Sequence, residues 1–187
     1  MKIGKFLIPL GAFVLLAIVL AIGIKHSPEK GVIASPFIGK AAPQFSLPDL
    51  SQPTKSITTA DLKGRWYAVN FFGSWCYACR QEHPTLMEVS RSRVLPIIGF
   101  DWKEQADSAN EQDDLGRAFL NQLGNPYTLV LADRDGRTAI NYGVTGAPET
   151  YLVNPEGVIV YKLTGQITKE IWEKEFVARV QGKPDKS

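Results

Sequence analysis

The sequence predicts an α/β domain with a central sheet flanked by helices, preceded by a single transmembrane helix. Two observations carry this prediction: β-forming runs alternate with helical patterns along most of the chain, and a long uncharged segment stands near the N-terminus. The 187 residues are 44% hydrophobic and 21% charged, which is enough for one domain with its own core. We expect a signal anchor over residues 1–24, a linker over 25–40 and the domain over 41–183.

The N-terminal segment from Phe6 to Ile24 contains no charged residue. As a helix it would span roughly 28 Å, close to the ~30 Å hydrocarbon core of a bilayer. The sequence that follows, Lys25 to Pro28, is a poor cleavage site, so an uncleaved signal anchor is preferred over a cleaved signal peptide. The flanking lysines favour, only mildly, a cytoplasmic N-terminus and an external domain. Prolines and glycines mark residues 25–40 as an extended tether.

The first part of the domain contains three strand signals. Ala42–Leu50 has prolines near both ends, which suits an edge strand or an extended arm. Ser56–Thr58 predicts a short strand, and Thr59–Gly64 predicts one helical turn closed by glycine. Trp66–Phe72 is a nearly continuous apolar run of β-forming residues, so we expect a strand covered on both faces.

The remainder of the domain continues the alternation. A helix is expected from the cysteine pair to about Ser90, with Pro84 as a kink. Further strands are expected at Val94–Phe100 and Thr128–Ala132, and a hairpin at Glu149–Val153 and Val158–Leu163. Further helices are expected at Gln112–Leu123, with Leu115, Phe119 and Leu123 on one face, and at Lys169–Val180, with Ile171, Trp172, Phe176 and Val180 as its apolar stripe.

Two cysteines, Cys76 and Cys79, stand at a predicted strand-to-helix junction. The first is placed at the helix N-terminus, where unpaired amide donors and the helix dipole favour a thiolate. Its pKa should therefore fall below the ~8.5 of a free cysteine, which makes it the attacking sulfur. The second lies one turn further on and can resolve a mixed disulfide by attacking the first.

Three other uses of the cysteine pair are less favoured. A zinc site needs more ligands, and the chain has only two histidines, of which His26 lies in the tether. A purely structural disulfide would close too short a loop to remove much unfolded-state entropy. Two inert core cysteines fit poorly with the preceding Trp75 and the junction between strand and helix. No nucleic-acid partner is indicated, because the net charge is only +2 and the basic residues are scattered.

The sequence around the cysteines, Val69 to Arg80, resembles the thioredoxin superfamily. It is more closely similar to the cytochrome c maturation group called CcmG or DsbE. That likeness rests on four motifs: Gly39–Phe45, Trp75–His83, Gly99–Glu104 and Gly143–Thr150. The last of these, Gly-Val-Thr-Gly-Ala-Pro-Glu-Thr, is the most specific to this group.

The resemblance implies a thioredoxin fold with an N-terminal β extension, held in the periplasm by an inner-membrane anchor. It implies a protein disulfide reductase that acts on apocytochrome c or on a CcmH-like thiol protein. Electrons would come from a membrane donor of the DsbD or CcdA kind. No cofactor or metal is expected apart from the redox-active disulfide Cys76–Cys79.

The resemblance also implies roles for neighbouring residues. Pro148 is expected in a cis peptide after Ala147, facing the cysteines. Together with Trp75 and Tyr77, these two residues are expected to contact the substrate.

A further expectation concerns the proton of Cys79. Asn70 occupies the place where many thioredoxins carry a buried acid. Glu82 and Glu149 are the expected replacements, because a nearby carboxylate can act as the base of a thiol. Ordinary structural or solvated charges remain the alternative for both. His83 is expected on the helix surface rather than as a catalytic base.

Three rival functions remain open. A general extracytoplasmic reductase similar to TlpA or ResA would use the same cysteines on another client. A peroxiredoxin would need a threonine three residues before its reactive cysteine, where this chain has Gly73. A non-catalytic module that binds apocytochrome would not need the cysteines at all.

Overall fold

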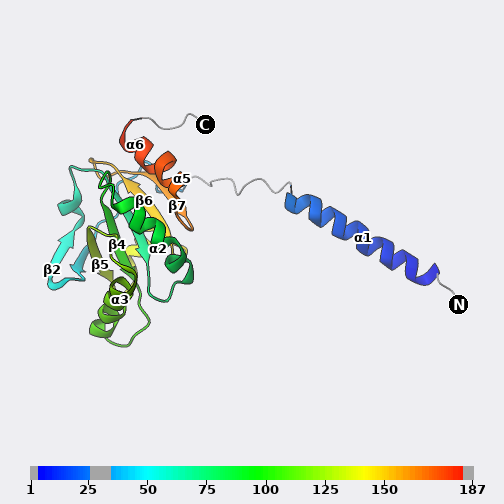
Figure 1. Cartoon of the computed structure of the whole chain (residues 1–187), viewed down its shortest axis with the longest axis horizontal. Helices are drawn as coiled ribbons and strands as arrows, with labels where there is room; N and C mark the ends of the chain where they lie inside the picture. The colour runs from blue at the N-terminus through cyan, green and yellow to red at the C-terminus, as the bar shows by residue number, and fades with distance from the viewer. Residues whose placement is uncertain (1–3, 26–34, 183–187) are drawn as a thin grey trace. The chain divides into compact units, whose positions relative to one another are not determined.

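The computed structural model describes residues 4–25 and 35–182, and Figure 1 traces them. The chain divides into two compact units, Met1–Ser35 and Pro36–Ser187. The first unit contains helix α1 (Gly4–Lys25), and the side chains described within it, at residues 9–20, are all exposed. Among the described residues, no helix combines the length and the apolarity that crossing a membrane requires.

The second unit is built on one seven-stranded mixed sheet with the order β2-β1-β5-β4-β3-β6-β7. Strands β3, β4 and β5 run parallel, while β6 is antiparallel to β3 and β1 is antiparallel to β5. The hairpins β1–β2 and β6–β7 complete the two edges. The strands are β1 (Ser46–Asp49), β2 (Gln52–Thr58), β3 (Tyr67–Phe72), β4 (Ile97–Trp102), β5 (Leu129–Asp133), β6 (Glu149–Val153) and β7 (Ile159–Thr164).

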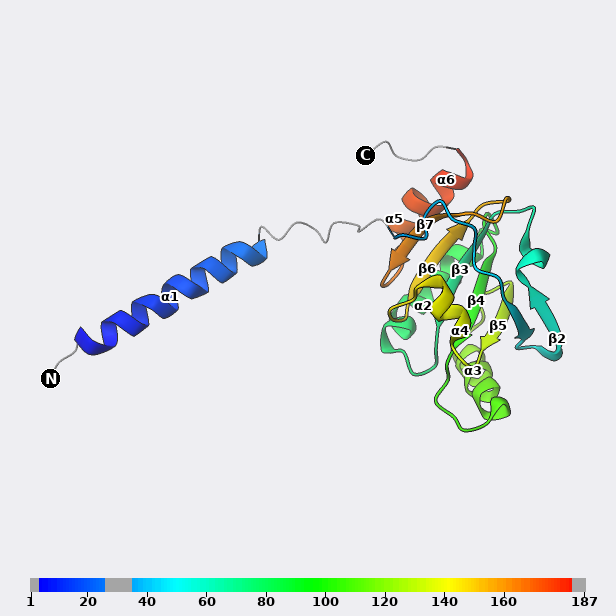
Figure 2. The same cartoon turned by 180° about the vertical axis from the view of Figure 1, so that it is seen from behind.

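Helices cover both faces of this sheet, as the two views in Figures 1 and 2 show. On one face lie α2 (Tyr77–Ser90), α3 (Ala109–Leu123) and the C-terminal helix, and their apolar residues share a core that includes both cysteines. The other face is covered by the short helix α4 (Arg137–Tyr142) and by the start of the domain. The architecture confirms the predicted α/β class and is a thioredoxin-like fold.

The two-residue period of a strand decides which side chains reach which core. Along β6, Leu152 belongs to the core beneath α2, whereas Tyr151 and Val153 belong to the opposite core. By the same alternation Thr150 faces the α2 side and Glu149 faces the α4 side.

Most predicted elements are confirmed, including the buried strand β3 and the β6–β7 hairpin. The segment expected as an edge strand is β1, which lies between β2 and β5, so the edge is formed by β2 instead. Helix α4 was not predicted; it begins directly after the turn that Asp133 and Gly136 close at the end of β5. In α3, Phe119 is buried as expected, but Leu115 is 38% exposed.

The C-terminal helix is one continuous helical segment with a wider turn in its middle. It runs through α5 (Lys169–Ile171), the π-helical η2 (Trp172–Val177) and α6 (Ala178–Val180). Trp172 and Phe176 are fully buried and stack on each other, which confirms the centre of the predicted stripe. A short 3-10 helix, η1 (Thr59–Leu62), follows β2 at the predicted position.

The start of the domain lies slightly earlier than predicted. Residues 26–34 of the expected linker lie outside the described residues. The remainder of that linker belongs to the domain unit, because the Gly39 N–H donates to the Ile159 carbonyl at 2.8 Å and Phe37 packs against the core on the α4 side. Ala41 then forms an isolated bridge with Val158.

Candidate active site

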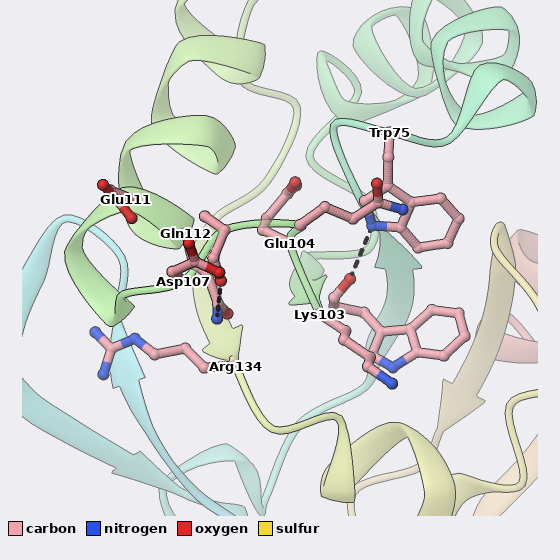
Figure 3. Close-up of a pocket in the computed structure, with 10 residues that line it drawn as sticks. Trp75, Lys103, Glu104, Asp107, Glu111, Gln112 and Arg134 are labelled. Atoms are coloured by element: carbon pink, nitrogen blue, oxygen red, sulfur yellow. Dashed lines mark hydrogen bonds between the residues drawn. The ribbon is translucent and has the colours of Figure 1, made fainter.

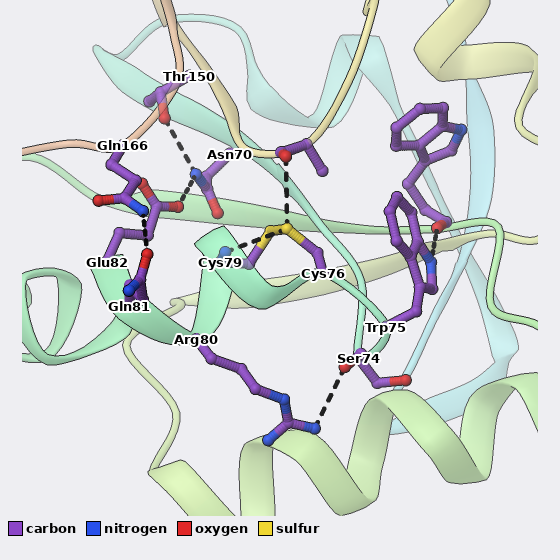
Figure 4. Close-up of a disulfide and its surroundings, with 12 residues drawn as sticks. Asn70, Ser74, Trp75, Cys76, Cys79, Arg80, Gln81, Glu82, Thr150 and Gln166 are labelled. Carbon is purple, nitrogen blue, oxygen red and sulfur yellow. Dashed lines mark hydrogen bonds between the residues drawn. A yellow bond between two sulfur atoms is a disulfide. The ribbon is translucent and has the colours of Figure 1, made fainter.

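The cysteine pair lies where β3 ends and α2 begins, and Figure 4 shows it as a closed disulfide. Cys76 is the N-cap residue of α2, and the backbone N–H of Cys79 donates to its sulfur at 3.1 Å. After reduction, the same amide and the helix N-terminus would stabilise negative charge on Cys76. The predicted division of roles, with Cys76 as nucleophile and Cys79 as resolver, therefore fits the geometry.

The loop between α4 and β6 faces the disulfide. The peptide bond between Ala147 and Pro148 is cis, as expected from the sequence. The carbonyl oxygen of Ala147 lies 3.4 Å from the sulfur of Cys76. A peptide that brings its own sulfur to Cys76 would therefore pass alongside this loop.

Two aromatic residues flank the cysteines on the surface. Tyr77 is 74% exposed and Trp75 is 41% exposed. The indole N–H of Trp75 donates to the carbonyl of Trp102 at 3.3 Å, and the two rings meet edge to face. Trp75 is thus a fixed wall beside the disulfide, whereas Tyr77 projects outward. Both placements suit contact with a partner.

The backbone just before Cys76 is held by a buried acid at the end of β4. Both the N–H and the hydroxyl of Ser74 donate to the carboxylate of Glu104, and Arg80 donates to the Ser74 carbonyl at 3.2 Å. Glu104 ends the motif Gly99–Glu104, but no role was predicted for it. The sequence feature that could have indicated a role is an acid two residues after β4, a strand whose end lies beside the end of β3 in a parallel sheet.

A second buried acid, Asp101, lies close to Glu104. Burial and the negative charge of Glu104 raise the pKa of Asp101 to about 9. Beyond it, Asp113 accepts two hydrogen bonds from Arg134, at 2.9 and 2.7 Å. A cavity of about 780 Å³ opens beside these groups, and Figure 3 shows Trp75, Glu104 and Arg134 among the residues that line it.

Glu82 lies on α2, one turn beyond Cys79, and is buried. Its carboxylate accepts hydrogen bonds from the side-chain amide of Asn70 at 3.1 Å and from the Ile167 N–H at 2.9 Å. Burial raises the pKa of Glu82 to about 7, although these two hydrogen bonds act in the opposite direction. The structure thus places a carboxyl that titrates near neutrality on the buried side of the redox pair.

Glu149 is not brought to the cysteines, because the alternation along β6 directs its side chain to the opposite face of the sheet. There it is fully buried and accepts hydrogen bonds from Thr145 and from the Tyr151 hydroxyl. Its remaining partner is Lys162, whose ammonium lies 2.8 Å away. The expectation that Glu149 exchanges a proton with Cys79 is therefore not supported by its position.

The expectation for His83 was wrong. Its side chain is buried between α2 and α3, where Nε2 lies 2.9 Å from the carbonyl oxygen of Gly124. Its ring also meets Phe119 edge to face. Burial lowers the pKa of His83, which keeps the imidazole neutral as a packing residue. The apolar faces of two helices that meet here could not be assigned to each other from the sequence.

No group of three or more metal-ligating side chains suited to hold a metal ion exists within residues 4–25 and 35–182. The site combines a thioredoxin-like fold, a disulfide at a helix N-terminus and a cis-proline loop that lies against the disulfide. These features define a thiol–disulfide oxidoreductase. The model of the AhpC/TSA family matches residues 38–162.

Comparison with known proteins shows which group of thiol–disulfide oxidoreductases the chain resembles. The chain is 44% identical over 181 residues to the thiol:disulfide interchange protein DsbE of Allochromatium vinosum, covering 95% of each chain. It is 37% identical to DsbE of Pseudomonas aeruginosa, covering 97% of this chain and 95% of that one. The crystal structure of a putative DsbE from Chlorobium tepidum shares the fold, with a TM-score of 0.60 at 24% identity, over 77% of this chain and 94% of that one. This chain belongs to the AhpC/TSA family of thioredoxin-fold proteins and, within it, to the DsbE thiol:disulfide interchange proteins.

Proposed function

We propose that this protein is a membrane-anchored periplasmic reductase that opens disulfides in apocytochrome c, or in a CcmH-like thiol protein, during c-type cytochrome biogenesis. The observation that carries the proposal is the segment 143–150, which comprises the loop between α4 and β6 and the start of β6. It contains the motif typical of the cytochrome maturation group and lies against the attacking sulfur, with the Ala147 carbonyl 3.4 Å from Cys76.

The anchor is proposed from the sequence run Phe6–Ile24, which would place the domain at the surface of the inner membrane. The exposed apolar side chains described within α1, such as Leu10, Phe13 and Leu15, support it, because a helix of this kind needs an apolar environment. The uncharged run extends beyond both ends of residues 9–20, the part of α1 whose side chains are described.

The reaction would proceed in two exchanges. The Cys76 thiolate attacks one sulfur of the client disulfide, which forms a mixed disulfide and releases the other client sulfur as a thiolate. The Cys79 thiolate then attacks the sulfur of Cys76, which forms the disulfide Cys76–Cys79 and frees the second client sulfur. Two electrons pass from the protein to the client, and a membrane dithiol donor of the DsbD or CcdA kind would restore the reduced pair.

Glu82 is proposed as the acceptor of the Cys79 proton in the second exchange. It is the carboxyl that the fold places one helical turn from Cys79, and its pKa of about 7 lets it accept and return a proton near neutral pH. Trp75, Tyr77 and the Ala147–Pro148 peptide are proposed to contact the client chain on either side of Cys76.

A trapping experiment tests the client. The Cys79→Ser variant, expressed as the full chain in its own membrane, should accumulate mixed disulfides at Cys76. Mass spectrometry should identify the captured peptide as the cysteine-containing segment of apocytochrome c or as the thiol protein that serves it. The double variant Cys76→Ser/Cys79→Ser is the matched control and should capture neither. Capture of unrelated envelope proteins alone would favour the general reductase instead.

A further inference from the structure

Asn70 is the central residue of a buried hydrogen-bond chain that ends at Glu82. Asn70 lies in the middle of β3 and is completely buried. Its amide nitrogen donates to Glu82 at 3.1 Å and to the hydroxyl of Thr150 at 3.0 Å, as Figure 4 shows. Both amide hydrogens are thereby used, and the amide oxygen points the other way.

The amide oxygen of Asn70 is occupied by Tyr127, whose phenol donates to it at 2.7 Å. Tyr127 stands in the loop between α3 and β5, 7% exposed, and its ring stacks on Phe72 with 4.9 Å between centroids. The phenol is therefore held in place by packing, independently of its hydrogen bond. A buried side-chain amide has two orientations, and the groups around it decide which is adopted.

The orientation of the Asn70 amide affects the protonation of Glu82. In the orientation seen here, Glu82 is offered hydrogen-bond donors on both of its oxygens, from Asn70 and from Ile167, and donors favour the ionised carboxylate. If the amide turned over, its oxygen would face Glu82 and favour the protonated acid. The turned amide would also leave the phenol without its acceptor.

The groups that face Glu82 from other elements are mostly neutral. β3 contributes Asn70 and the loop before α5 contributes the Ile167 N–H, while Cys79 precedes Glu82 on its own helix. The titratable Tyr127 interacts with Glu82 from the loop before β5. Burial raises the pKa of the Tyr127 phenol, and the negative charges of Glu82 and Asp101 raise it further. The phenol therefore stays protonated and remains a donor.

We propose that Tyr127 is a positioning residue. By fixing the orientation of the Asn70 amide, it favours the ionised form of Glu82, which can accept the proton of Cys79. This rests on the proposed function of Glu82. Among the hydrogen bonds of the described residues, those of the Asn70 and Tyr127 side chains reach Glu82, Thr150 and each other, and none of them reaches a reacting sulfur. Their effect should appear only in the second exchange, in which Cys79 gives up its proton and attacks Cys76.

The two exchanges separate when the reduced full-length protein, in detergent, reacts with the aromatic disulfide dithiobis-nitrobenzoate. The Cys76 thiolate cleaves the probe, forms a mixed disulfide and releases one nitrothiobenzoate. Cys79 passes its proton to Glu82, attacks Cys76 and releases the second nitrothiobenzoate, so stopped-flow absorbance follows each step. The rate of the second release is measured from about pH 5 to 9.

We expect Tyr127→Phe to move the midpoint of the second release upward by about half to one pH unit, because Glu82 loses a fixed donor. Glu82→Gln should remove that titration, and Tyr127→Phe/Glu82→Gln should match Glu82→Gln alone. The matched control is Tyr142→Phe, since the buried Tyr142 hydroxyl has no hydrogen-bond partner within the described residues. It should leave the midpoint unchanged.

The outcomes separate the two ideas. If Glu82→Gln titrates as the unaltered protein does, the role of Glu82 fails, and the role of Tyr127 fails with it. If Glu82→Gln acts as expected but Tyr127→Phe does not shift the midpoint, only the positioning role is overturned. The positioning role is also overturned if Tyr127→Phe slows the second release by the same factor in the Glu82→Gln background as in the unaltered protein. The infrared band of the protonated Glu82 carboxyl, identified by its loss in Glu82→Gln, provides a second readout and should titrate with the same upward shift in Tyr127→Phe.

Discussion

The ammonium of Lys162 lies 2.8 Å from the carboxylate of Glu149, in the interior and on the face of the sheet opposite the redox disulfide. Lys162 also donates to the carbonyl of Gly143 at 3.0 Å. Because Glu149 binds Thr145 as well, the pair ties both ends of the loop that carries the cis proline. Glu149, which was predicted to be a proton acceptor, thus holds the loop in place.

Glu149→Gln should destabilise the protein without changing the pH profile of thiol exchange. The substitution leaves the ammonium of Lys162, whose side chain is only 11% exposed, without its counter-charge. Breaking one side of a buried pair costs about 3–5 kcal/mol. Urea unfolding should show this loss, and Lys162→Met in the Glu149→Gln background should recover part of it. A shifted exchange profile in Glu149→Gln would instead point to direct proton transfer.

Glu82 should make stability fall with rising pH. Its pKa is raised from 4.5 to about 7 in the fold, so the native state binds its proton more tightly than the unfolded chain does. The stabilisation is complete below about pH 4.5 and is lost as the pH rises to about 7. Relative to Glu82→Gln, the oxidised protein should lose about 3 kcal/mol over this range in urea unfolding.

The matched control for this measurement is Glu88→Gln on the same helix. Glu88 is exposed and pairs with the exposed Lys169, so its loss should change stability little. If the unfolding free energies of Glu82→Gln and of the unaltered protein change in parallel from pH 4 to pH 8, the pH dependence does not come from Glu82.

Asp101 should produce a similar decline that continues to higher pH. Burial and the negative charge of Glu104 raise its pKa from 3.8 to about 9, so its stabilisation is complete below about pH 3.8 and is lost progressively as the pH rises to about 9. Between pH 7 and pH 9, where Glu82 is already ionised, Asp101→Asn should gain about 2 kcal/mol relative to the unaltered protein. The exposed Asp135 serves as the control, since Asp135→Asn should show no such trend. A gain of equal size in both variants would rule out a specific effect of Asp101.

Gly116→Ala should destabilise the protein, although alanine in a helix is ordinarily favoured over glycine by about 1 kcal/mol. A Cβ atom at Gly116 would overlap the carboxylate of Asp101, which packs directly against α3. We expect a loss of about 1–3 kcal/mol in urea unfolding, as for other overpacked sites. The same substitution in an Asp101→Ala background should cost less. A Gly116→Ala protein that is more stable than the unaltered protein would contradict this prediction, because it would show that α3 can move away from Asp101 at little cost.

The α/β class, most of the strands and the redox pair can be predicted from the amino-acid sequence. These follow from local rules: the apolar run that becomes β3 must be covered on both faces, and a cysteine at the start of α2 meets unpaired amides. The motifs also indicated the cis proline and the group to which the chain belongs.

The different roles of the acidic residues, in contrast, depend on how the chain packs in three dimensions. Glu82 and Glu149 look equivalent as sequence neighbours of the site, yet the alternation along β6 sends Glu149 to the other face, while α2 carries Glu82 inward beside Cys79. The parts played by Glu104 and Tyr127 depend on contacts between distant segments, with Ser74 and Asn70 respectively. Such contacts arise when strands and helices pack, so no local pattern records them.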